Sequence, residues 1–123
     1  FLDTFLSIGQ SFKLYITYII AYHATIKKIQ AHLTQPGLDS FANSRASYLL
    51  AKKCRINSFS GFLILPVQRI PRYRMFLADL LKQFDKHPLH DALREKLVKA
   101  VDLIYEIGDY CNSKTKDSRR TKR

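Results

Sequence analysis

The fold of this chain is decided by LPVQRIPRYR, residues 65–74. Its two prolines, five residues apart, lie inside a run whose apolar residues otherwise recur at three- and four-residue steps, as in a helix. Proline lacks an N–H and collides with the carbonyl four residues back, so a helix interior seldom holds two of them. We therefore predict one helical element from about residue 59 to residue 84, bent near Pro66 and restarted with Pro71 in its first turn.

The segments on either side of this element show the helical period as well. From Ile8 to Leu33 the apolar residues follow a strict four-three spacing, which predicts one long helix with a bundle-type seam, ended by the Gln-Pro-Gly at residues 35–37. The same spacing returns near residues 90–91 and runs to Cys111, which predicts a last helix. In the first helix Ile16, Ile20 and His23 widen the apolar stripe, and His23 is expected to be a core residue whose hydrogen bonds are satisfied.

Between the first helix and the central element the pattern is weaker. Residues 38–54 suggest short helices that begin near Asp39 or Ser40, and Asn57 or Ser58 is a plausible N-cap of the central element. No alternating run typical of a strand is present in the sequence. The predicted fold class is therefore all-α: an elongated helical bundle with three long helices and a short helical insert.

Length and composition favour one domain in a reducing compartment. The chain has 123 residues, 46% of them apolar, and no run of about 20 uncharged apolar residues that a membrane span needs. It begins at Phe1 without a methionine or a secretory signal pattern, so we expect this start to be a cut. Cys54 and Cys111 fit buried thiols better than a disulfide framework. The expected location is cytoplasmic.

The net charge of +11 is unevenly distributed. Residues 1–78 hold ten basic residues against two acidic ones, and residues 114–123 hold six against one. This balance favours an anionic partner, which leaves an acidic protein face, a membrane surface or nucleic acid. Nucleic acid is not expected, because no helix carries a dense basic stripe and the aromatic residues follow the seams. The expected membrane or anionic contacts are in the tail: Lys114, Lys116, Arg119 and Arg120.

The sequence shows no pattern for bond-making chemistry. The chain has no glycine-rich phosphate loop, no nucleophile elbow and no paired cysteines near a histidine. His87 and His90 lie three apart but straddle Pro88, a spacing that resembles no known metal site. We therefore predict a protein that is not an enzyme in the bond-making sense, with no metal and no cofactor.

The proline-arginine stretch also carries a family resemblance. Residues 63–74, continued by Leu77 and by Asp-Leu-Leu-Lys at 79–82, resemble the third conserved region of the Dbl-homology domain. Ile8-Gly9 and the aromatic residues that follow are similar to the second conserved region. Residues 107–112 resemble the last bundle helix, with Cys-Asn in place of the usual Ile-Asn. The resemblance covers nearly the whole chain up to about residue 113.

This resemblance implies a function and a set of site residues. Dbl-homology domains are the exchange modules of guanine nucleotide exchange factors for Rho-family small GTPases, and they displace the GTPase switches from magnesium and nucleotide. The resemblance assigns to the GTPase contact Arg72 and Asn112, with Arg69 and Arg74 beside them. It assigns to Pro66, Gln68, Pro71 and Tyr73 the role of shaping the helix. For Arg69 a second interpretation is a residue that packs at the edge of the core. The alternatives without a binding role are a solvated cation for Arg72 and a helix C-cap for Asn112.

The resemblance also leaves a gap. The family's first conserved region, an N-terminal helix with a glutamate that contacts switch I, is absent from this chain. Residues 1–113 are thus expected to be a partial domain, and residues 114–123 a basic tail or linker toward a possible pleckstrin-homology domain. Met75 and Phe76 replace the usual leucines. The alternative function is a helical scaffold that binds other proteins and has lost exchange.

Overall fold

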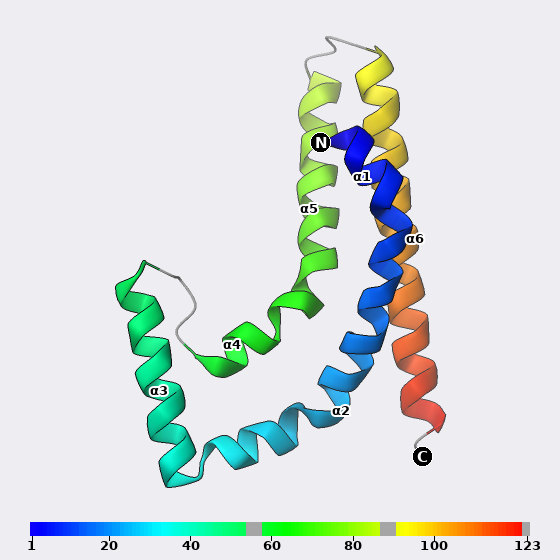
Figure 1. Ribbon diagram of the computed structural model, residues 1–123. Coiled ribbons are helices and arrows are strands. Elements are labelled where there is room, and N and C mark those ends of the chain that lie inside the picture. The colour runs from blue at the N-terminus through cyan, green and yellow to red at the C-terminus, as the bar shows by residue number, and fades with distance from the viewer. Residues whose placement is uncertain (54–57, 87–90, 122–123) are drawn as a thin grey trace.

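In the computed structural model the described residues are 1–53, 58–86 and 91–121, and within them every regular element is a helix. The expectation of an all-α bundle is therefore confirmed. The elements, shown in Figure 1, are α1 (Leu2–Ile8), the 3₁₀ helix η1 (Gly9–Leu14), α2 (Tyr15–Leu33), α3 (Pro36–Ala51), α4 (Phe59–Leu63), α5 (Leu65–Lys86) and α6 (Asp91–Thr121).

Helices α5 and α6 lie antiparallel, side by side, and form the body of the molecule (Figure 1). The blue segment made by α1, η1 and the start of α2 runs along α6. The rest of α2 leaves the body, and α3 lies apart from α5 and α6 before α4 leads back to them (Figure 1). We call α3 and α4 together the arm, and its main contacts are with α2 and α5.

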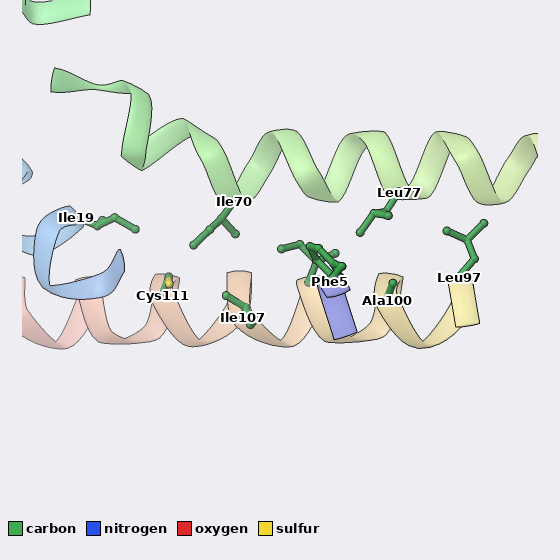
Figure 2. Packing of buried hydrophobic residues seen from close by; sticks show 9 residues of the cluster. Phe5, Ile19, Ile70, Leu77, Leu97, Ala100, Ile107 and Cys111 are labelled. Carbon is green, nitrogen blue, oxygen red and sulfur yellow. The ribbon is translucent and has the colours of Figure 1, made fainter. Parts of the chain in front are cut away.

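The core is the seam between α5 and α6. Figure 2 shows Ile70 and Leu77 of α5 pointing toward α6, with Phe5 of α1 and Ile19 of α2 closing the same cluster. The stripe that α6 contributes recurs at three- and four-residue steps and is fully buried or nearly so: Leu97, Ala100, Ile104, Ile107 and Cys111. Burial of such side chains stabilises a fold by about 1.5–3 kcal/mol each. The free thiol of Cys111 is part of this packing.

The prediction of one α-helix over residues 8–33 is wrong at its start. Residues 9–14 form η1, and α2 begins only at Tyr15. The physical reason is a non-local contact: buried Gly9 is pressed against α6, where a Cβ would overlap the side chain of Leu103. The tighter winding of η1 is compatible with this close approach. Ile8, expected on the seam, is half exposed as a result.

The bend predicted near Pro66 is confirmed, but the predicted restart at Pro71 is wrong, because Pro66 has the first-turn role. The break lies at Ile64, between α4 and α5, and Pro66 occupies the first turn of α5, where a missing N–H costs nothing. Pro71 lies inside α5 and does not restart it. Because Pro71 cannot donate to the carbonyl of Val67, the helix interior loses one backbone hydrogen bond there. The Pro71 ring itself is exposed.

The insert is a single helix. The expectation of several short helices starting near Asp39 or Ser40 is wrong, because Pro36 fits the first helical position and starts α3 there. The predicted N-cap at Ser58 is confirmed: its Oγ accepts a hydrogen bond from the N–H of Gly61 at 3.0 Å. The expectations on Cys54, on Asn57 and on a helix start at His90 fall outside the described residues.

The last helix continues well past the predicted apolar stripe. It passes Asn112 and Ser113 and ends at Thr121, so most of the basic tail is a helical extension of α6. The C-cap alternative for Asn112 is therefore wrong, since this residue lies nine positions before the end of the helix. Two residues of this extension, Thr115 and Ser118, are partly buried.

A side-chain hydrogen bond ties α2 to the helix break. The hydroxyl of Tyr18 donates to the carbonyl oxygen of Leu63 at 2.6 Å, across 45 residues of sequence. Leu63 is the last residue of α4, where carbonyl groups lose their helical donors. The bond therefore stabilises the point at which the arm meets α5.

Replacing Tyr18 with Phe removes this bond and little else. We expect Tyr18→Phe to lower the free energy of unfolding by about 1 kcal/mol, measured by urea denaturation. Tyr22→Phe is the matched control, because the Tyr22 ring stacks on Tyr18 at 6.5 Å but its hydroxyl makes no hydrogen bond to another described residue. Equal losses in the two variants would contradict a specific role for the Tyr18 hydroxyl.

Candidate partner-binding site

Helix α5 points its three arginines in three directions. Arg69 lies over the ring of Tyr73, 5.8 Å from its centroid, on the side where Tyr73 packs against α1 and η1. Arg74 turns toward α6 and lies 3.8 Å from the centroid of the Tyr105 ring. Arg72 is exposed between these two sides. The structure therefore separates residues that the resemblance grouped together, and only Arg72 faces solvent without an aromatic partner among the described cation–π contacts.

Arg72 has the geometry of a contact residue. Its guanidinium donates to Oε1 of Gln68 at 3.2 Å, one helical turn earlier, so Gln68 orients the charge without burying it. The next turn of α5 exposes two large apolar side chains: Met75 is 66% exposed and Phe76 is 53% exposed. A charge that is oriented but solvated, beside exposed apolar surface, matches the composition of protein–protein contacts. The core-edge role falls instead to Tyr73, which packs on Phe5 and Phe12.

Arg74 and Asn112 meet at a hollow that lies between α2, α5 and α6. The hollow has a volume of about 300 Å³ and is lined by residues of all three helices. Arg74 reaches it from α5, and exposed Asn112 reaches it from α6. Gly108 also lines the hollow, and a Cβ at that position would lie 4.0 Å from the Arg74 guanidinium, which is an ordinary contact distance. Two of the four residues assigned to the GTPase contact are therefore brought together across the α5–α6 seam.

The hollow also contains His23, which the sequence placed in the core. His23 is exposed at the edge of α2 and lines the hollow together with Ile19 and the α6 side chains. Partial burial lowers the pKa of the His23 imidazole, and the nearby positive charge of Arg119 lowers it further. In the sequence, His23 lies one helical turn after Ile19, and this spacing alone could have placed His23 beside the seam. Ordinary core residues have the same spacing, so it does not predict an exposed histidine.

The four tail cations do not form one surface. Lys116 and Arg119 line the hollow, whereas Lys114 lies over the ring of Tyr110, 5.9 Å from its centroid. Successive helix residues are about 100° apart, so Lys114 and Lys116 point to opposite sides of α6. Arg120 is exposed and is not among the residues that line the hollow.

Metal chemistry finds no support in the described part of the chain. No group of three or more His, Cys, Asp or Glu side chains lies close enough there to hold a metal ion. His87 and His90 lie outside the described residues.

Among the described helices, none combines the length and the apolar character needed to cross a membrane.

The contact between Arg119 and His23 can be tested by titration. Arg119→Gln removes a positive charge near the imidazole, so the pKa of His23 should rise toward its ordinary value, as measured by NMR. Arg120→Gln makes the same charge change on a side chain that does not line the hollow, and it should leave the His23 titration nearly unchanged. Equal shifts in both variants would contradict the placement of Arg119.

Comparison with known proteins adds an independent line of observation. The RhoGEF domain family matches residues 1–112 of this chain. The chain is similar to "Guanine exchange factor for Rac 30" of Dictyostelium discoideum, with 35% identity over 94% of this chain and 7% of that protein. It is similar to "Rac guanine nucleotide exchange factor JJ" of the same organism, with 27% identity over 94% of this chain and 9% of the relative.

A mammalian relative shows the same pattern. The mouse protein "FYVE, RhoGEF and PH domain-containing protein 6" is 28% identical over 93% of this chain and 8% of its own length. The chain thus spans less than a tenth of the length of these relatives. No solved structure matches the chain significantly.

Proposed function

The chain belongs to the RhoGEF domain family, and from this premise we propose that it promotes release of GDP from a Rho-family small GTPase. The observation that carries the proposal is the match over residues 1–112, which includes both sides of the α5–α6 seam. Two relatives carry Rac in their names, so Rac is the first GTPase to test. The relatives' names do not favour the scaffold alternative.

The proposed contact surface is the exposed side of α5 and α6. Arg72 would contact the switch II region of the GTPase, and Asn112 would contact it from α6. Arg74 supports this surface from behind, because its contact with Tyr105 fixes the spacing of the two helices near Asn112. Arg69 would take part only at the edge, since it already covers the Tyr73 ring. Pro66, Gln68 and Pro71 determine where α5 starts and how Arg72 is held.

The proposed mechanism involves no bond-making step. The α5–α6 surface would bind most tightly to a GTPase whose switches are displaced from magnesium and nucleotide. By linkage, the free energy of this preference is subtracted from the binding of the nucleotide. A thousandfold weaker hold on GDP requires about 4 kcal/mol of preference. A few desolvated contacts of the kind that Arg72 and Asn112 can make supply free energies of this size.

Location and membrane contact complete the proposal. Exchange on a Rho-family GTPase would take place in the cytoplasm and at membrane surfaces, and the basic end of α6 would favour an anionic surface. Each cation near such a surface contributes about 1 kcal/mol. The residues concerned are Lys114, Lys116, Arg119 and Arg120, which lie on different sides of α6. Only some of them can therefore face one plane.

Arg72→Glu is the sharpest test of the proposed surface. We expect the rate of release of fluorescent GDP from Rac to fall at least about tenfold, because a contact charge is reversed. Arg72 is exposed, and among the described residues its side chain is hydrogen-bonded only to Gln68, so the melting midpoint should shift by less than about 3 °C.

The matched control for this variant is Lys86→Glu. Lys86 is exposed in the last turn of the same helix, about 21 Å along the axis from Arg72, and the charge change is the same. Exchange should be nearly unchanged in this variant. If the wild-type protein accelerates release from no Rho-family GTPase, the proposed function is wrong. Binding of a GTPase without acceleration would assign the chain to the scaffold alternative.

A further inference from the structure

The α2 end of the hollow gathers positive charge. Lys116 and Arg119 line it from α6, Arg74 lines it from α5, and His23 lines it from α2. The lining includes no carboxylate. These four side chains come from three helices, and His23 and Arg119 are 96 residues apart in sequence. The cluster is therefore a product of the fold.

This charge is not compensated by neighbouring acids. None of the ion pairs between described residues includes any of the four side chains. Helix α2 has no acidic residue, and α5 has none before Asp79. Helix α6 carries Asp109 and, between Lys116 and Arg119 in the sequence, Asp117, but neither aspartate lines the hollow. Three fixed cations thus share one concave surface, which raises the local concentration of anions.

The shape of the hollow limits what can enter it. Three helices bound the hollow, and its floor is apolar, formed by side chains such as Ile19, Ile70 and Cys111. Its volume is about 300 Å³. A compact anion can enter a hollow of this size and reach the cations that line it, namely Lys116, Arg119 and Arg74.

We propose that this hollow is a binding site for a multiply phosphorylated small ligand, held by Lys116, Arg119 and Arg74. The proposal is independent of the exchange activity, since it concerns binding alone. Guanidinium and ammonium groups form charge-assisted hydrogen bonds with phosphate oxygens, and Arg119 and Arg74 can do so in the bidentate manner. His23 is placed to donate a further hydrogen bond once its imidazole is protonated.

His23 offers a direct readout of an anion in the hollow. In the free protein, burial and the positive charge of Arg119 lower its pKa. Arg74 of α5 and Lys116 of α6 are the other cations that line the same hollow. A bound phosphate group favours the imidazolium form, so the pKa of His23 should rise on binding. Asp109 and Asp117 are present in both states and do not line the hollow.

Phosphate groups of this kind occur on soluble inositol phosphates and on phosphoinositide head groups, so the experiment includes both. The protein is titrated with inorganic phosphate, with inositol trisphosphate, and with phosphatidylcholine vesicles that contain or lack phosphatidylinositol bisphosphate. We expect saturable binding of the multiply phosphorylated probes and a rise of the His23 pKa by NMR. Soluble binding assigns the free ligand, and binding to vesicles alone assigns the lipid.

Two charge-matched variants of α6 test the geometry. Lys116→Gln with Arg119→Gln removes two cations that line the hollow, and we expect affinity to fall at least about tenfold. Lys114→Gln with Arg120→Gln removes two cations from the same helix that do not line it, and affinity for soluble inositol trisphosphate should change less than about threefold. All four side chains are exposed, so both variants should keep the wild-type melting midpoint.

Three results would overturn the site. The first is equal loss of affinity in both variants, which would reduce the contact to diffuse attraction by the charge of α6. The second is binding without any change in the His23 titration. The third is equally tight binding of a short polyglutamate peptide with the same sensitivity to Lys116 and Arg119, which would assign the hollow to an acidic protein partner.

Discussion

The structure depends on the apolar seam along which α5 and α6 pack. Leu77 and Ile70 meet the stripe of Leu97, Ile104 and Ile107, and these side chains have almost no exposed surface. Every other part of the body is placed by reference to α6, since α1, η1 and α2 all contact it. The seam also determines the candidate site, because a residue just beside the stripe on either helix must lie at the edge of the groove between them.

The sequence predicts this seam well because its information is local. A four-three spacing indicates which side of a helix is apolar. In α6 the spaced residues from Leu97 to Cys111 are all buried, and Leu93, at the start of the same spacing, is 38% exposed. The start of α2 could not be predicted in this way. There the winding depends on contact between Gly9 and Leu103, which are 94 residues apart. Likewise, the two prolines show where backbone hydrogen bonds are lost, but not at which residue the helix breaks.

The candidate site, like the fold, was predictable from the sequence only in part. The exposure of Arg72 and the separation of Arg74 from Arg69 and Arg72 follow from helical geometry and were predictable. The hollow was not predictable, because three helices build it and no segment carries its signature. His23 illustrates the difficulty: its spacing is that of a core residue, yet it lies at a charged edge. Which of these side chains touch a GTPase remains a prediction from the family.

The attachment of the arm has a consequence for how the molecule opens. Helix α3 packs mainly on the outer part of α2 and on α4, and it contributes no residue to the buried cluster of the body. The Tyr18 hydroxyl adds one hydrogen bond, to the carbonyl of Leu63, where the arm meets the body. A unit with so little shared core separates at a lower free energy than global unfolding requires. Amide protons of α3 should therefore exchange with deuterated solvent well before those of α6, which would make the arm a separate cooperative unit within one small domain.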